Sequence, residues 1–123
     1  MMHDDLVAEI FDLGDHIRYV AVGEGQAVEL HQRAGLANAS AATSDRFEEL
    51  FVNPALIVLA RQRGELDCGG LRYLVVAYGS FGQIVVPTSA GHVSISVEPG
   101  VEPTGPAEQV QDLLDRYGLA KRG

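Results

Sequence analysis

The 123-residue sequence contains one cysteine, one lysine and no long apolar run. The lone Cys68 cannot form a disulfide within the chain, so a reducing compartment is the default expectation. Nine basic residues stand against seventeen acidic ones, and the formal net charge is -8. Such a chain is poorly suited to neutralise phosphates, and we expect neither nucleic acids nor anionic membranes as partners.

Membrane and secretion signals are also missing. The longest unbroken apolar run covers residues 55–60, which is far shorter than a membrane span. Residues 1–5 lack both the basic flank and the apolar stretch of a signal peptide. We therefore predict a cytoplasmic protein. Its length fits a single domain, residues 1–123, that buries roughly two-thirds of its unfolded surface.

Residues 71–97 carry the clearest pattern in the chain, with three strand-like runs separated by two turns. The predicted strands are 71–77, 83–86 and 92–97, and glycine-containing turns lie between them. In the last run, Val93, Ile95 and Val97 alternate with His92 and two serines. This alternation predicts one buried face and one wet face.

The rest of the chain supplies helices and a first hairpin. We predict a helix over 4–13, strands over 16–22 and 27–33 around a turn at 23–26, a helix from the Ser44 cap that breaks at Asn53-Pro54 and resumes to 63, and a last helix over 106–117. Gly64 is expected to end the middle helix, and residues 120–123 are expected to fray. The fold class is α+β, with a five-stranded antiparallel sheet.

The second half of the middle helix is apolar on all sides. A helix that is covered by its own sheet on one face still needs a cover on the other face. A second copy of the chain is the simplest cover in a domain of this size, so we predict a homodimer. The predicted interface consists of Leu56, Ile57, Val58, Leu59 and Arg61.

The sequence contains no pattern that specifies a chemistry. His92 on the expected wet face is the most suggestive residue, but an ordinary hydrogen-bonded histidine is the favoured interpretation. The histidine spacings match no metal site, and the Gly79-to-Gly82 turn lacks the lysine and the following helix of a phosphate loop. A structural or incidental thiol is the favoured interpretation of Cys68. We assign no catalytic residue, no metal ligand and no cofactor site.

A group of aromatic and polar residues near the meander forms the remaining candidate surface. If Tyr78 and Phe81 bracket their turn, they present rings at one end of the sheet where a ligand or a protein could dock. Core packing is the favoured alternative for each ring. The candidate ligand or partner surface comprises Tyr73, Tyr78, Phe81, Gln83 and His92.

The element order, helix-strand-strand-helix-strand-strand-strand-helix, resembles the roadblock/LC7 family and more loosely the profilin-like folds. The segments IRYVAVGEGQAVELHQR (17–33) and LRYLVVAYG (71–79) are most similar to it, whereas the Asn53-Pro54 break departs from the continuous helix of the family. The resemblance implies a symmetric dimer in which the middle helices pack side by side and the sheets join. It also implies a scaffold, or a regulator of small GTPases, without an active site of its own.

Two hypotheses of function follow. The first is a non-enzymatic homodimeric scaffold or regulatory module whose partners are a second copy of itself and a small GTPase or another protein. The alternative is a small-ligand sensor with a pocket at the aromatic end of the sheet. A deep pocket would favour the sensor, and a flat sheet with an apolar helix face would favour the scaffold.

Overall fold

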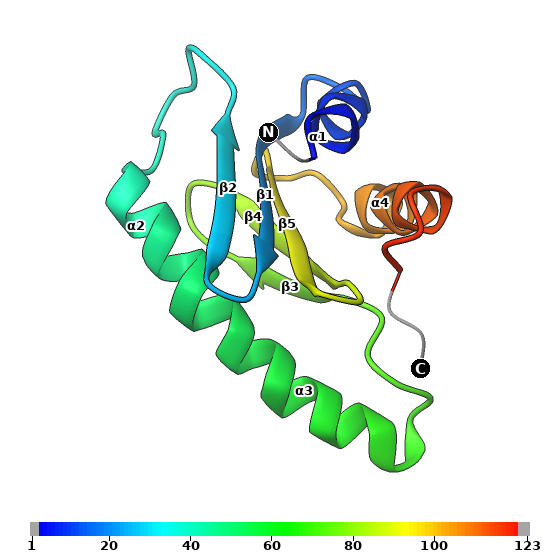
Figure 1. Cartoon of the computed structure of the whole chain (residues 1–123). Coiled ribbons are helices and arrows are strands. Elements are labelled where there is room, and N and C mark those ends of the chain that lie inside the picture. Colours follow the sequence, from blue (N-terminus) through cyan, green and yellow to red (C-terminus); the bar gives the residue numbers. More distant parts are fainter. Residues whose placement is uncertain (1–2, 121–123) are drawn as a thin grey trace.

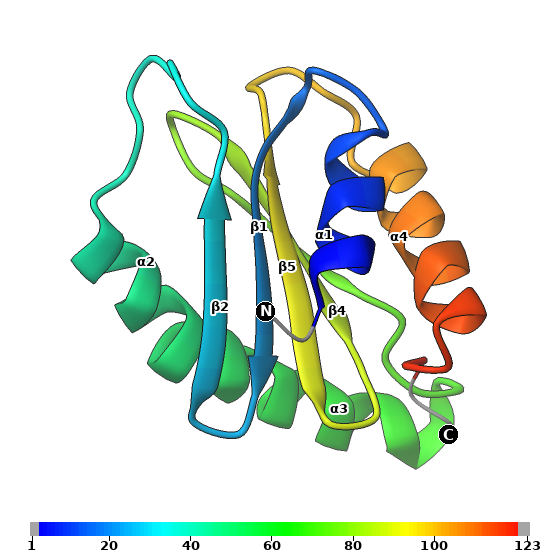
Figure 2. The ribbon, with the colours of Figure 1, turned by 45° about the horizontal axis from the view of Figure 1, so that its top comes forward.

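The computed structural model describes residues 3–120, in which a five-stranded antiparallel sheet lies between two layers of helix. In chain order the elements are α1 (Asp4–Phe11), β1 (Ile17–Glu24), β2 (Ala27–Gln32), α2 (Ala42–Phe47), a π-helical turn η1 (Glu48–Val52), α3 (Asn53–Asp67), β3 (Leu74–Ala77), β4 (Gly82–Pro87), β5 (Gly91–Val97) and α4 (Thr104–Arg116). Helices α1 and α4 cover one face of the sheet, and the α2-to-α3 helix crosses the other (Figures 1 and 2). The predicted fold class and element order are confirmed.

Strands β1 and β5 join the two halves of the sheet. The strand order is β2-β1-β5-β4-β3, so the first hairpin and the meander meet along β1 and β5. Their register places Gly23 opposite His92 and Ala21 opposite Ser94. Strands β2 and β3 are the edges. Pro87, which has no N–H to donate, is the last residue of β4 and lies beyond the segment paired with β3.

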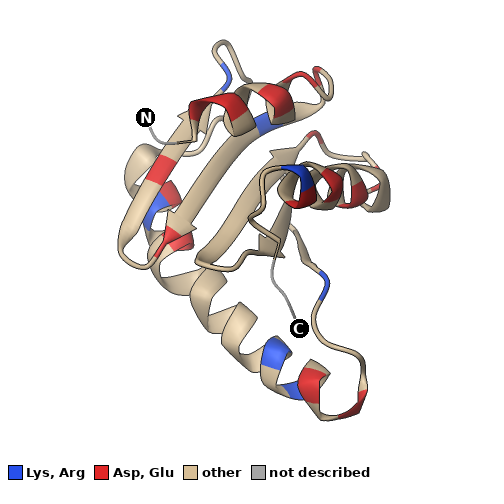
Figure 3. Cartoon of the chain, turned by 45° about the vertical axis from the view of Figure 1, so that its right-hand side comes forward, with Lys and Arg blue, Asp and Glu red and all other residues tan. Residues whose placement is uncertain are grey.

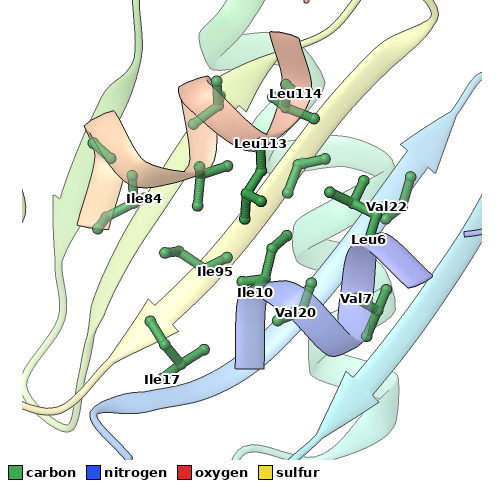
Figure 4. Packing of buried hydrophobic residues seen from close by; sticks show 14 of the residues in the cluster. Leu6, Val7, Ile10, Ile17, Val20, Val22, Ile84, Ile95, Leu113 and Leu114 are labelled. Carbon is green, nitrogen blue, oxygen red and sulfur yellow. The ribbon is translucent and has the colours of Figure 1, made fainter. Parts of the chain in front are cut away.

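The apolar core lies between the sheet and the α1 and α4 layer (Figure 4). Leu6 and Ile10 of α1, together with Val110 and Leu114 of α4, are almost completely buried. They pack with sheet residues that include Val20, Ile84 and Ile95. Each such side chain contributes about 1.5–3 kcal/mol through burial, so this layer supplies most of the hydrophobic stabilisation.

The second face of the sheet is not wet, which corrects the prediction made for residues 92–97. His92, Ser94 and Ser96 are 4%, 0% and 4% exposed. The middle helix lies across this face and removes it from water (Figure 2). The polar residues there are buried because the helix supplies a hydrogen-bonding partner for His92 and Ser94, the carboxylate of Glu49.

The middle helix is continuous from Ala42 to Asp67, so the predicted break at Asn53-Pro54 is wrong. Pro54 has no N–H and its ring clashes with the carbonyl of the preceding α-helical turn. The π-helical turn η1 lies directly before Pro54 and widens the helix there, which accommodates the proline without a break. Ser44 is also not the cap, because the helix begins at Ala42.

Gly64 does not end the helix as predicted; it lies buried inside it. After the helix the chain folds back, and the Gly70 N–H donates to the Gly64 carbonyl at 3.1 Å. A Cβ on Gly64 would lie 3.1 Å from the Gly70 carbonyl carbon. Glycine therefore favours the close backbone approach here, and does not mark a helix stop.

Smaller differences concern the ends of elements. Gly23 and Glu24 belong to β1, and the turn is confined to Gly25, which has a φ of +63°, and Gln26. His3 lies 3.0 Å from the Glu24 carboxylate through its Nε2. Ala120 forms a bridge with Thr88, whereas the predictions for residues 1–2 and 121–123 lie outside the described residues. Between residues 3 and 120, no helix has both the length and the apolar composition needed to cross a bilayer.

Candidate functional site

A buried carboxylate, Glu49, joins the middle helix to the sheet. It lies on η1, is 1% exposed and accepts four hydrogen bonds. Its Oε1 accepts from His92 Nε2 at 2.8 Å and from Asn53 Nδ2 at 2.9 Å. Its Oε2 accepts from the Tyr19 hydroxyl at 2.8 Å and from the Ser94 hydroxyl at 2.6 Å. We call these five residues the Glu49 network.

The strand register builds this network. Tyr19 on β1 and both His92 and Ser94 on β5 point to the face beneath the middle helix, since the alternate residues of each strand belong to the core on the other face. Gly23, opposite His92, leaves the space that the imidazole occupies. A Cβ on Gly23 would lie only 2.6 Å from His92 Cε1.

Burial and hydrogen bonding act in opposite directions on Glu49. Burial raises the pKa of its carboxyl, but the hydrogen bonds from His92, Ser94 and Tyr19 outweigh burial, and the net pKa is lowered. Burial and the Glu49 charge raise the pKa of Tyr19. The carboxylate is therefore ionised at neutral pH and saturated with donors. Such a group holds the helix on the sheet and has no lone pair left to take a proton from a substrate.

A cavity of about 650 Å³ lies next to this network, between the start of the middle helix and one end of the sheet. Its lining includes Asp45, Phe47, Glu48, Tyr78, Phe81 and Gln83. The Tyr78 and Phe81 rings meet edge to face, 5.5 Å apart, and the Tyr78 hydroxyl donates to Glu48 at 3.0 Å. We call this space the aromatic–acidic cavity.

The outward side of the middle helix carries an exposed apolar stripe. Phe47, Phe51, Val58, Leu59 and Leu66 are 59%, 63%, 50%, 66% and 77% exposed. Their spacing follows the helix repeat on the side opposite Glu49, Asn53 and Ile57, which are buried toward the sheet. This stripe is a surface that the single chain leaves uncovered.

The residues of the predicted interface do not all lie on this stripe. Val58 and Leu59 are exposed on it, and Leu56 and Arg61 are half-buried beside it. Ile57 faces the sheet and is 5% exposed, which corrects its assignment to an outward surface. This part of the helix is apolar on all sides in the sequence because one side packs on the sheet and the other forms the exposed apolar stripe.

The structure brings together three of the five residues predicted as a ligand or partner surface. Tyr78, Phe81 and Gln83 line the aromatic–acidic cavity. Tyr73 packs against the core on the opposite face of the sheet, with the Arg72 guanidinium 5.5 Å above its ring. His92 is buried in the Glu49 network, so it is not a surface residue.

Sequence reasoning missed Glu49, Asn53 and Tyr19 as members of a site. Glu49 was predicted only as part of the helix that follows Ser44. The available signal was its spacing, because Glu49, Asn53 and Ile57 recur every four residues and mark the side of the helix that faces the sheet. Within residues 3–120, no group of three or more His, Cys, Asp or Glu side chains is arranged to hold a metal ion.

The acidic residues of the helix predict a two-sided pH dependence of stability. Burial and neighbouring negative charge raise the pKa of Glu48, so its ionised form opposes folding, and stability should rise as falling pH protonates it. The lowered pKa of Glu49 acts the other way. Its contribution is present above its ordinary value of 4.5 and is lost as pH falls through its lower folded value. We expect the free energy of unfolding to rise slightly on acidification toward pH 4.5 and to fall below it.

Urea unfolding between pH 3 and pH 7 measures this profile. Glu48→Gln should reduce the rise in the free energy of unfolding on acidification toward pH 4.5, and Glu49→Gln should reduce the fall below it. The other carboxylates contribute equally in the unmodified chain and in both variants. A fall that is equally steep in Glu49→Gln would contradict the ionised state assigned to Glu49.

The layers described above define an α+β domain in which one long helix crosses a five-stranded meander sheet, and two shorter helices cover its other face. This is the roadblock/LC7 fold. The chain matches the crystal structure of a roadblock/LC7 domain from Streptomyces avermitilis with a TM-score of 0.69, over 94% of this chain and 93% of that one, at 17% sequence identity. No family model matches the sequence, and no curated protein does. At this identity the likeness establishes the fold alone.

Proposed function

We propose that the chain is a non-enzymatic regulatory or scaffold module that works as a homodimer. The observation that carries the proposal is the exposed apolar stripe of the middle helix, in a domain in which β3 is an edge strand. A small GTPase or a component of a larger protein assembly is the proposed further partner, and the cytoplasm is the proposed location. The roadblock/LC7 fold, generally a non-enzymatic regulatory domain, supports this class of function.

The stripe has the character of an interface. Contiguous apolar surface of this kind is rare on a monomer and marks a contact site. Figure 3 shows that the first part of α3 carries no charged residue, whereas charges gather toward its C-terminal end. Residues 53–60 indeed contain none. A charge-free centre with a charged border is the composition expected of a protein–protein contact.

A second copy is the occupant that fits best. In a two-fold dimer the same stripe packs against itself, so apolar meets apolar without any further requirement on a partner. Among residues 3–120, strand β3 pairs only with β4, and its other edge is without a strand. Edge strands are ready sites for pairing with another chain. A helix-to-helix contact with edge pairing would cover both exposed features at once.

Leu59→Asp tests the dimer. A carboxylate at the centre of the contact has to be desolvated without a partner, and we expect the dissociation constant to rise by about 100-fold or more. Light scattering coupled to size-exclusion chromatography should give twice 13.2 kDa for the unmodified chain and 13.2 kDa for the variant at the same micromolar concentration. Leu59 is 66% exposed, so the fold itself should tolerate the change.

The matched control is Gln109→Asp, which adds the same charge to an exposed position of α4 on the other side of the sheet. It should remain a dimer. A monomeric mass for the unmodified chain across the concentration series, or a dimer that survives Leu59→Asp, would overturn the proposed interface. Circular dichroism of each variant separates loss of the dimer from loss of the fold.

A further inference from the structure

The aromatic–acidic cavity adjoins the exposed apolar stripe at Phe47, but its acidic and polar lining is a feature that the proposed dimer does not explain. Its volume of about 650 Å³ lies within the ordinary range for small-molecule sites. We propose that this cavity binds an organic cation, an ammonium or guanidinium group, on a molecule that also carries a carbonyl or hydroxyl acceptor. The site goes beyond the proposed dimer function and lies within one chain.

The carboxylates that line the cavity carry uncompensated negative charge. Asp45 accepts a hydrogen bond from Ser40, and Glu48 accepts from Tyr78, and both donors are neutral hydroxyls. The ion pairs found within residues 3–120 include no basic partner for either carboxylate. Burial and neighbouring carboxylates raise the pKa of both, which is the signature of charges that lack a counter-ion.

Two basic residues near this region, Arg18 and Arg46, do not line the cavity. Arg18 lies 5.9 Å from the Phe81 ring, but its guanidinium donates to the Glu98 carboxylate at 3.0 Å and to the Ala37 carbonyl at 2.8 Å. It is 4% exposed and does not line the cavity. The negative potential of the cavity is therefore left for a ligand to neutralise.

The cavity also has an aromatic lining. Three rings, those of Phe47, Tyr78 and Phe81, border the same space as the two carboxylates. Ring faces attract ammonium and guanidinium groups, and the attraction grows where water is excluded. Aromatic rings combined with carboxylates are the standard protein environment for an organic cation, whereas a hydrated metal ion would require converging oxygens instead.

The cavity lining contains an unsatisfied hydrogen-bond donor. Gln83 is 2% exposed, lines the cavity, and its Nε2 has no hydrogen-bond partner among residues 3–120. A buried amide N–H without an acceptor costs about 1–3 kcal/mol, so such groups call for a partner. A ligand carbonyl or hydroxyl next to the cation would supply it. This requirement distinguishes a basic amino-acid residue in a peptide from a simple amine.

The test is an NMR titration of the 15N-labelled protein with Nα-acetyl-arginine N-methylamide, which has both the cation and carbonyl acceptors. We expect shifts at Tyr78, Phe81 and the Gln83 side-chain amide. The citrulline analogue, equal in shape but neutral, should bind at least about tenfold more weakly. Agmatine, which keeps the cation and lacks the carbonyls, should also bind more weakly than the diamide.

Variants locate the binding site. Glu48→Gln removes one charge from the lining and should weaken the binding of the arginine probe by about tenfold. Glu108→Gln makes the same change on exposed α4 and should leave binding unaltered. Leu59→Asp should also retain binding, because Leu59 does not line the cavity. If Leu59→Asp still binds the probe, the cavity binds its ligand independently of the dimer.

Several results would overturn the proposal. Equal binding of the arginine and citrulline probes would exclude recognition of charge, and absence of shifts at millimolar probe would exclude the site. Agmatine binding as tightly as the diamide would remove the role given to Gln83 and assign the cavity to free amines. Loss of binding in Leu59→Asp would show that the site is not built within one chain.

Discussion

Glu49→Leu is expected to lower the free energy of unfolding by about 4 kcal/mol, because removing one partner of a buried charged network leaves the others unpaired. Tyr19, Ser94, His92 and Asn53 all direct hydrogen-bond donors at the same carboxylate. Leucine fills similar space and accepts nothing. Domains of this size have a total stability of about 5–15 kcal/mol, so the loss is a large part of the whole.

Glu49→Gln should cost much less, and the comparison shows why the acceptor matters. The amide oxygen can still accept from His92 and Asn53. The hydroxyls of Tyr19 and Ser94 can rotate and accept from the new NH₂ group, since a hydroxyl is both donor and acceptor. We expect a loss of about 1–2 kcal/mol, mainly from exchanging charge-assisted bonds for neutral ones.

Urea unfolding at pH 7 measures both variants, with Glu48→Gln as the control on the neighbouring residue. Glu48 is only half-buried and its charge opposes folding, so this control should be unchanged or slightly more stable. If Glu49→Leu loses no more stability than Glu49→Gln, the four donors are satisfied in some other way and the network is not what holds the middle helix on the sheet.

The sequence predicts the element order well because hydrophobic period and turn residues agree through most of the chain. The alternation of residues 92–97 correctly identifies Val93, Ile95 and Val97 as core residues. It misassigns the other face, because a polar residue has the same pattern whether water or a buried partner satisfies it. The partner, Glu49, is 43 residues from His92 along the chain, and periodicity carries no information over that distance.

Local rules also fail at two points of the middle helix, each for a tertiary reason. Pro54 is compatible with the continuous helix because a π-helical turn precedes it, and no sequence rule for proline specifies that turn. Gly64 has the residue type expected at a helix end, but it lies inside the helix, where the backbone of Gly70 packs closely against it. The cavity was predicted only in part. Tyr78, Phe81 and Gln83 are neighbours in sequence and could be grouped, whereas Asp45 and Glu48 are distant in sequence and belong to the middle helix.

Gly91→Ala should be nearly as damaging as Glu49→Leu, although it only adds a methyl group. Gly91 begins β5 and pairs with Glu24 of β1. A Cβ at this position would lie 2.0 Å from the Gly23 carbonyl oxygen and 2.9 Å from its carbon. Backbone atoms cannot turn aside as a side chain can, so the strands have to separate. We expect a loss of about 3 kcal/mol or more in urea unfolding.

Gly79→Ala is the matched control, because it removes the same glycine entropy from the unfolded chain at a position where nothing lies within 4 Å of the new methyl group. Its stability should change by less than about 0.5 kcal/mol. The difference in the free energy of unfolding between the two alanine variants then gives the effect of the close approach of β1 and β5. Equal stabilities would contradict that approach, and with it the register that sets His92 opposite Gly23 and within reach of Glu49. If only Gly91→Ala loses stability and the NMR signals of the His92 ring also shift, the pairing of β1 with β5 supports the Glu49 network that holds the middle helix.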